Sequence, residues 1–430
     1  MSSRRVLISG AGIAGPVVAH WLGRAGISST IVERSPTPRT SGQTIDIRGA
    51  ARTVMTAMGV EDEIRANCTK EEGMYFVNAN DQVQGAFPVD HENGNSGTCD
   101  IEILRYKLAS IFCKSAEKTT TFIYGDAIKN ITQTESEAVV DFESGKTQAF
   151  DVIVLADGMH SRARSLVFPK EGKEGGVEYR PAGFMICYFQ IPYSSSKDGD
   201  WSRWWIREGS RSIWIRPDGK SDEPSSRVFL MTCDPEALEK LRNYRSLDIR
   251  AQKQLWRELF AGGGWQTDRV LDAMDADDDS NFYMQDVAQV KASKWHSGRV
   301  VLVGDAGYCP SPLSGMGTSV AITGSYVLAN ELAKLDSFSS ITDLSGAFTQ
   351  YENICRPYVE KAQDAPFGLI KFAYQKSWFG VRMLYFAIKT ISFVVKAPGF
   401  NKLAGLIFGD EPEEEKLLHL PEYPITSRSA

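Results

Sequence analysis

Near its start the chain reads Val6-Leu7-Ile8-Ser9-Gly10-Ala11-Gly12-Ile13-Ala14-Gly15, and this stretch decides the fold. Residues 6–9 are apolar and β-prone, and residues 14–24 have a helical pattern, so a strand turns into a helix at the glycines. Gly10 permits the tight turn, Gly12 lets a pyrophosphate approach the backbone, and Gly15 lets the helix pack on the strand. The helix begins at Ala14, where unpaired N–H groups favour phosphate. The stretch predicts a Rossmann-like dinucleotide site; the alternative is a glycine turn that binds nothing.

A carboxylate stands where such a site needs one. The apolar strand Ser29-Thr30-Ile31-Val32 ends at Glu33, and an acidic residue about 20 residues after the glycines suits a ribose hydroxyl pair. We expect Arg34, which follows Glu33, to contact the cofactor as well. NAD and FAD fit these features equally well.

Two later segments distinguish the two cofactors. Val152-Ile153-Val154-Leu155 runs into Ala156-Asp157-Gly158, and Val300-Val301-Leu302-Val303 runs into Gly304-Asp305. An aspartate at the end of a strand can accept hydrogen bonds from a polyhydroxyl chain. FAD has a ribityl chain and NAD does not, so Asp157, Gly304 and Asp305 favour FAD.

The loop after Asp305 is rich in small residues. It contains Pro312, Gly315 and Gly317 and leads into a helical pattern over residues 318–335. Its backbone can lie against a flat ring, and a helix N-terminus stabilises negative charge by about 0.3–1 kcal/mol. We therefore expect this loop to hold the flavin ring in its anionic reduced form; the alternative is a surface loop.

With these three segments in this order, the chain resembles the class A flavoprotein monooxygenases, the family of para-hydroxybenzoate hydroxylase, from Val6 to about Pro357. Within that family it is most similar to the tetracycline-inactivating monooxygenases, through Arg39 and the sequence Gly42-Gln43-Thr44-Ile45-Asp46. The resemblance implies that Arg39 contacts NADPH and that Asp46 contacts FAD. It also implies that Arg105, in Glu102-Ile103-Leu104-Arg105, reaches the flavin, and that Asp126 ends a strand passing the adenine.

The chain also departs from the family pattern. Gly304-Asp305-Ala306-Gly307-Tyr308 stands where Gly-Asp-Ala-Ala-His is frequent, and Thr318-Ser319 stands where Asn is common. These departures leave flavin binding intact. Nothing is therefore carried over from the family about the substrate-facing side of the flavin.

Composition is that of an ordinary globular enzyme. The 430 residues are 42% hydrophobic and 24% charged, which is ordinary for a globular protein. The net charge of −6 does not indicate nucleic-acid binding. The seven cysteines form no C-x-x-C pair, and no histidines have metal-ligand spacing, so we expect neither disulfides nor a metal. Met1-Ser2-Ser3-Arg4-Arg5 does not resemble a signal peptide. We expect a cytoplasmic monomer or homodimer.

The order of segments predicts an α/β fold: a Rossmann-like FAD-binding domain with an inserted β-sheet substrate domain and a C-terminal helix. Residues 1–176 would form the first part of the FAD-binding domain, with a second helix over 49–65, and 291–360 its second part. Residues 177–290 would form the inserted domain, an all-β region with one helix at 247–260, and 71–100 resemble a further piece of it. Residues 361–430 would form a helical segment and tail.

Substrate-contacting residues are expected on strands of the inserted domain. Arg203, in Trp201-Ser202-Arg203-Trp204-Trp205, and Tyr188 are the catalytic candidates, because a cation or a phenol could hold a substrate phenolate. The competing interpretation is ordinary packing for Tyr188 and a solvent-side ion pair for Arg203.

Residues 378–395 are apolar, but Arg382, Lys389 and Lys396 interrupt this part of the sequence. No uninterrupted apolar run reaches the length needed to cross a bilayer. We expect a helix that clamps the two domains together and no membrane contact; an interfacial membrane helix is the alternative.

The resemblance implies a monooxygenase that takes electrons from NADPH or NADH and lets reduced FAD react with O₂ at C4a. One oxygen atom then passes to an aromatic or polycyclic, polyketide-like molecule, by hydroxylation or by Baeyer–Villiger insertion. The alternatives are an FAD-dependent reductase, a halogenase and a non-catalytic flavin-binding protein. A halogenase would need Trp-x-Trp-x-Ile-Pro and a catalytic lysine, and Ile213-Trp214-Ile215-Arg216-Pro217 matches this only in part.

Overall fold

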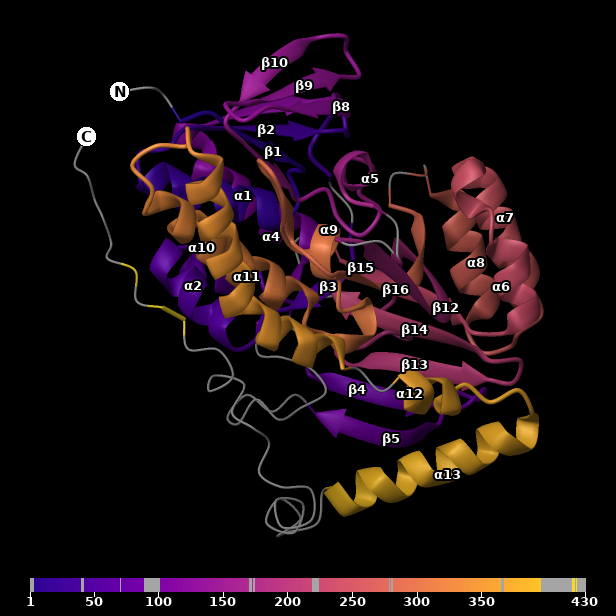
Figure 1. Ribbon diagram of the computed structural model, residues 1–430. Helices are drawn as coiled ribbons and strands as arrows, with labels where there is room; N and C mark the ends of the chain where they lie inside the picture. The colour runs from indigo at the N-terminus through magenta and orange to yellow at the C-terminus, as the bar shows by residue number, and fades with distance from the viewer. Residues whose placement is uncertain are drawn as a thin grey trace.

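The structure is a computed structural model of the 430-residue chain. It describes all residues except 1–3, 40–41, 70, 89–100, 170–171, 173–174, 219–223, 278, 280, 365–366, 396–419, 422 and 424–430. Two large sheets dominate it, each with helices against it (Figure 1).

The first sheet has six strands in the order β17-β18-β11-β1-β2-β7. Their bounds are β17 His296–Ser297, β18 Val300–Leu302, β11 Val152–Leu155, β1 Val6–Ser9, β2 Ser29–Glu33 and β7 Thr120–Tyr124. The strands from β18 to β7 are parallel neighbours, and β17 runs antiparallel to β18. Parallel strands end at one edge of a sheet, so the segments that follow them lie close together.

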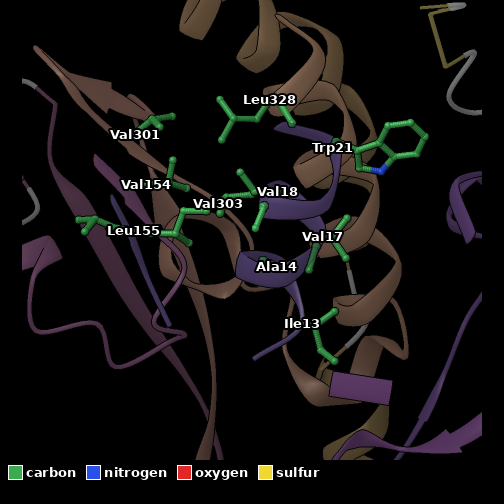
Figure 2. Packing of buried hydrophobic residues seen from close by; sticks show 14 of the residues in the cluster. Ile13, Ala14, Val17, Val18, Trp21, Val154, Leu155, Val301, Val303 and Leu328 are labelled. Carbon is green, nitrogen blue, oxygen red and sulfur yellow. The ribbon is translucent and has the colours of Figure 1, made fainter. Parts of the chain in front are cut away.

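Helices cover this sheet with apolar side chains. They are α1 (Ala14–Arg24), α4 (Arg105–Ala116), α10 (Gly317–Ala333) and α11 (Ile341–Gln363). Figure 2 shows Val17 and Val18 of α1 and Leu328 of α10 beside Val154 and Val301 of the sheet, in one buried cluster. A small antiparallel sheet, β8 (Ile128–Gln133), β9 (Ala138–Phe142) and β10 (Thr147–Phe150), joins the same core.

The second sheet has seven strands in the order β16-β12-β15-β14-β13-β4-β5. They are β16 Tyr283–Ala292, β12 Val177–Pro192, β15 Ser225–Thr232, β14 Arg211–Asp218, β13 Ser202–Arg207, β4 Gly73–Val77 and β5 Val83–Pro88. The early hairpin β4–β5 therefore completes this sheet, with β4 parallel to β13. Residues 89–100 lie outside the described part.

Helices and short elements differ from the expectation in two places. The helix expected over 49–65 is two helices, α2 (Ala50–Met58) and α3 (Glu61–Ala66), because Gly59 adopts a left-handed conformation with φ 71°. The region expected to be all-β with one helix carries three: α6 (Pro235–Leu241), α7 (Ile249–Phe260) and α8 (Thr267–Ala276). They bury one face of the second sheet.

The remaining elements connect or flank these layers. They are β3 (Thr44–Asp46), β6 (Glu102–Leu104), α5 (Arg164–Val167), α9 (Asp305–Tyr308), α12 (Phe367–Ala373), α13 (Trp378–Val395) and the single 3₁₀ turns η1 (Glu117–Thr119), η2 (Tyr244–Ser246) and η3 (Pro312–Ser314). β3 pairs with β6 as a two-stranded ribbon.

The C-terminal helix α13 does not have the expected role of a clamp. Its apolar residues Val381, Tyr385 and Ile388 pack in one cluster with Ile206 of β13, Phe76 of β4 and Phe87 of β5, all in the second sheet. Figure 1 shows the helix as the outermost element beside β5. It therefore lies on the edge of one sheet.

Candidate functional site

The cofactor candidates follow the carboxyl ends of five neighbouring parallel strands. Along the edge from β18 to β7, these strands lead into Gly304-Asp305, Asp157, Gly10, Glu33 and Asp126, respectively. Residues up to about 300 positions apart in the sequence thus line one edge, in the place where α/β sheets bind ligands.

At three glycines on this edge, a neighbouring atom lies so close that a side chain would be crowded. A Cβ on Gly10, whose φ is +109°, would lie 2.6 Å from the carbonyl oxygen of Ala156, and one on Gly15 would lie 2.1 Å from that of Gly10. A Cβ on Gly304 would lie 3.2 Å from that of Ala14 at the start of α1. Gly12 has nothing within 4 Å of its Cβ position, so this loop presents bare backbone to open space.

Glu33 and Asp126 lie side by side at the far end of the edge. The Glu33 carboxylate accepts a hydrogen bond of 2.9 Å from the Ala11 N–H, which fixes it against the glycine loop. The backbone N–H of Asp126 donates to the Glu33 carbonyl oxygen over 3.2 Å. The Asp126 carboxylate, however, accepts hydrogen bonds from the Ser144 hydroxyl and from two backbone N–H groups, so it holds a turn.

Two aspartates, Asp157 after β11 and Asp305 after β18, place buried carboxyl groups at this edge. Asp157 Oδ1 is buried and has no hydrogen-bond partner among the described residues. Burial raises the pKa of Asp157, and burial likewise raises that of Asp305, which the Arg105 guanidinium opposes. A buried acceptor without a donor is costly, so the Asp157 carboxylate suits a ligand that brings hydroxyl groups.

The loop that should hold the flavin ring meets β3. Gly315 has φ +66°, and its Cβ position is 4.0 Å from Asp46 Oδ2. The backbone N–H of Arg48 donates to Ser319 Oγ of α10 over 2.9 Å, and Asp305 Oδ1 is 3.9 Å from the Cβ position of Gly317. The structure thus brings Asp46, Asp305, Gly315 and Gly317 together, while Pro312 begins the turn η3 ahead of them.

Three arginines gather at the mouth of this site. Arg105 begins α4, and its backbone N–H donates to the Gln43 carbonyl oxygen over 3.0 Å. Electrostatic interactions link Arg39 to Arg105, Arg34 and Glu33. Arg39 and Arg34 are exposed, so the cluster offers positive charge to an anion arriving from solvent.

These observations fit FAD. The bare backbone at Gly12 suits a pyrophosphate, the orphaned Oδ1 of Asp157 suits a polyhydroxyl chain, and the loop from Pro312 to Gly317 suits a flat ring. Among the described residues no group of three His, Cys, Asp or Glu could hold a metal ion.

The second sheet turns an aromatic row toward the flavin loop. Its members, Tyr283, Tyr188, Phe229, Trp214, Trp204 and Phe76, are cross-strand partners on successive strands from β16 to β4. Neighbouring ring centroids are 4.6–5.3 Å apart. Leu313 of the flavin loop packs against this face.

A small pocket of ≈ 220 Å³ opens at one end of the aromatic row, lined by Gly42, Gln43, Tyr188, Arg227 and Tyr283 among others. Tyr283 donates a hydrogen bond to the Gln43 side chain. A larger cavity of ≈ 1140 Å³, measured in the same way, lies around His296, Gly298 and Thr342. It contains none of the glycine segments, so the smaller pocket is the better substrate site.

Of the two catalytic candidates, the structure brings only Tyr188 to this pocket. Its ring stacks on Tyr283, its hydroxyl accepts from the Gln285 amide over 3.2 Å, and burial raises its pKa well above the usual value. Arg203 pairs in register with Ile215, on the face opposite Trp204, and forms an ion pair of 3.1 Å with Asp81. This is the solvent-side ion pair considered above.

Sequence reasoning missed two arginines on the aromatic face. Arg227 and Arg216 are register partners, two residues from Phe229 and Trp214, and side chains two apart share a face. Arg227 is buried, lines the pocket, and its Nε has no hydrogen-bond partner among the described residues. Residues 228–231 are continuously apolar, so no alternation in the sequence marked the face on which Arg227 lies.

Arg216 pairs with buried carboxylates and is not available to the substrate pocket. It forms buried ion pairs with Glu71 and Glu102 and donates to Thr44 Oγ1 over 2.6 Å. Burial raises the pKa of Glu102 to about 7, against the pull of Arg216. The cluster ties β14 to the ribbon that carries Asp46, which fixes the second sheet relative to the flavin loop.

Comparison with known proteins agrees with this geometry. The model of the FAD binding domain family matches residues 3–365. Monooxygenase CTB7 of Cercospora beticola is 36% identical over 433 residues, and FAD-dependent monooxygenase asL6 of Sarocladium schorii is 31% identical over 437; both alignments cover 98% of each chain. The crystal structure of tetracycline destructase Tet(55) aligns with a TM-score of 0.75 and 29% identity, over 98% of this chain and 99% of that one.

Proposed function

Since this chain belongs to the FAD binding domain family and is an FAD-dependent monooxygenase, we propose that it uses NADPH or NADH to oxygenate an aromatic or polyketide-like small molecule. The observation that carries the proposal is the aromatic row opposite the flavin loop, with Arg227 in the pocket beside it.

The first sheet would hold the cofactor through the residues at its edge. Asp157 and Asp305 would accept hydrogen bonds from the ribityl hydroxyls, Glu33 from the ribose, and Gly12 would leave room for the pyrophosphate. Asp46 would contact the ring side, beside Gly315. Bound FAD supplies electron transfer from the nicotinamide and the activation of O₂.

The arginine cluster at the mouth would receive the nicotinamide cofactor. Arg39 is exposed and lies in the same electrostatic cluster as Arg34 and Arg105. A guanidinium there can bind a phosphate in bidentate fashion. Among the described residues, three guanidinium groups act together with one carboxylate, Glu33, in this cluster, so a net positive charge remains available to an anion.

The aromatic row would position the substrate. Flat apolar rings favour a flat apolar substrate in stacked or edge-on contact. The indole Nε1 atoms of Trp204 and Trp214 are buried without hydrogen-bond partners among the described residues, so each can donate to a carbonyl or hydroxyl oxygen. A substrate with aromatic rings and several oxygens satisfies both features.

Tyr188 and Arg227 would have different roles in this pocket. Because burial raises the pKa of Tyr188, its phenol stays neutral and serves as a hydrogen-bond donor or a stacking surface rather than as a base. Arg227 has a free Nε and stays cationic, so it can hold a phenolate or enolate oxygen. Stabilising that anion makes the neighbouring carbon electron-rich, as oxygen transfer requires.

The chain would divide into a part that binds FAD and a part that binds the substrate. We infer that residues 1–176 and 291–360 form the FAD-binding part. Residues 177–290, with β4 and β5 added to their sheet, form the substrate-binding part.

A screen of NADPH and NADH oxidation over phenols and polycyclic ketones tests the proposal, with Arg227→Gln and Arg203→Gln as a matched pair. Both changes remove one guanidinium from the second sheet. Only Arg227→Gln should lower kcat/KM for the stimulating substrate, by about 10- to 100-fold, the equivalent of one charge-assisted hydrogen bond. Equal losses in both variants would remove Arg227 from the substrate site.

A further inference from the structure

The C-terminal helix α13 is held to the second sheet by one of its faces. Val381, Tyr385 and Ile388 are buried against it. The Tyr385 hydroxyl donates to the Val77 carbonyl oxygen over 2.6 Å and accepts from the Ile206 N–H over 2.9 Å. Ser392 accepts from the Ala86 N–H over 3.0 Å. These four residues, spread over three turns, fix the rotation of the helix.

The opposite face of α13 is apolar and exposed. Phe379, Phe386 and Phe393 are 68%, 68% and 78% exposed, and Met383 lies between them at 52%. The spacing of four, three and seven residues places these side chains on one stripe. Trp378, at the start of the helix, is 61% exposed. An amphipathic helix at a protein surface normally turns its polar side to water, whereas α13 is apolar both on the face that meets the sheet and on this exposed stripe.

The charge around this stripe has one sign. Between Asp364 and Asp410 the sequence contains no acidic residue and six basic ones, whereas the whole chain carries a net charge of −6. Four of the six are described and exposed: Lys371, Lys376, Arg382 and Lys389. Arg382 stacks over the Trp378 ring, with its Cζ 4.6 Å from the centroid. The apolar stripe is thus flanked by cations.

We propose that α13 docks this enzyme on an anionic phospholipid surface, lying in the plane of the interface with Phe379, Phe386 and Phe393 in the acyl boundary. Aromatic side chains on one face of a helix and Lys or Arg beside them are the features of interfacial helices. No helix among the described residues is long and apolar enough to cross a bilayer, so the contact is peripheral.

Charge favours a lipid surface over a second copy of the chain. A symmetric dimer through this face would bring Arg382 and Lys389 of one copy toward the same residues of the other, because a two-fold interface pairs a patch with itself. Like charges oppose such an interface, whereas anionic headgroups attract each basic residue. The inference does not depend on which substrate the enzyme oxidises.

Co-sedimentation of the full-length holoenzyme with vesicles tests the proposal. Phosphatidylcholine vesicles with phosphatidylserine should sediment the protein, vesicles of phosphatidylcholine alone should sediment far less, and salt should reduce the difference. Arg382→Gln/Lys389→Gln should weaken binding about thirtyfold, from the loss of two basic contacts. Phe379→Glu/Phe386→Glu should abolish it.

Matched variants separate the patch from general charge effects. Leu166→Glu/Leu247→Glu adds the same charges at exposed leucines away from α13, and should keep vesicle binding. All variants should retain FAD absorbance and melting temperature. Failure of the wild type to bind anionic vesicles, equal loss in both glutamate pairs, or a dimer in ultracentrifugation that Phe379→Glu/Phe386→Glu dissociates would each overturn the proposal.

Discussion

Asp157→Asn should have opposite effects on the apoprotein and on FAD binding. In the apoprotein, Oδ1 of Asp157 is buried without a donor, and burial raises the pKa of the carboxyl group. Replacing the carboxylate by an amide removes a buried charge, so the apoprotein should gain about 1 kcal/mol of unfolding free energy at neutral pH. A purely structural aspartate would lose stability on the same change.

FAD binding should weaken in the same variant. A hydrogen bond from a ribityl hydroxyl to a carboxylate contributes about 1.5–3 kcal/mol, and one to a neutral amide about 0.5–1.5 kcal/mol. The difference of about 1–1.5 kcal/mol corresponds to roughly tenfold in Kd. Titration of apoprotein with FAD, followed by quenching of flavin fluorescence, measures it. Asp141→Asn on β9, the middle strand of the small antiparallel sheet, should leave the Kd unchanged.

The pH dependence gives an independent check with a defined sign. The folded apoprotein holds the Asp157 proton more tightly than the unfolded chain does, so it loses stability as pH rises from the ordinary aspartate pKa through the raised one. The advantage of Asp157→Asn should therefore grow across that window. An apoprotein destabilised by the change at every pH, with unchanged FAD affinity, would refute the assignment.

The other predictions concern the edge and the buried ion cluster. Asp305→Ala should weaken FAD retention on dialysis more than Arg39→Ala, whereas Arg39→Ala should mainly slow flavin reduction by NADPH in stopped-flow measurements. Arg216→Met should cost about 3–5 kcal/mol in urea unfolding, because it leaves two carboxylates buried without their cation. Since burial raises the pKa of Glu102 from 4.5 to about 7, Glu102→Gln should gain stability relative to wild type as the pH rises from about 4.5 to about 7, and the difference should level off above that; a difference that stays constant across this window would contradict that.

Local patterns predicted the cofactor side of this protein well. Each glycine segment follows a short apolar strand, so the strands β1, β11 and β18 and the positions of Gly10, Asp157 and Asp305 were accessible from the sequence. The helix α6 was also accessible: Asp234 caps it by accepting from the Ala237 N–H, with proline at the first position. It was missed because only seven residues show the pattern.

The substrate side depends on contacts that no local pattern contains. Whether Arg203 or Arg227 faces the flavin loop is decided by strand register, and a shift of one residue exchanges the faces. The partners of Arg216 come from residues 71 and 102, far away in the sequence. The exposed face of α13 likewise became visible only once Tyr385 and Ser392 fixed which side meets the sheet.

We propose that this site passes an oxygen atom from O₂ to a molecule held against the aromatic row. Mass spectrometry of the product formed under ¹⁸O₂, with the substrate that best stimulates NADPH or NADH oxidation, tests it most directly. We expect a product that gains one labelled oxygen atom. A product without label, or one that has gained hydrogen or halogen instead, would contradict it.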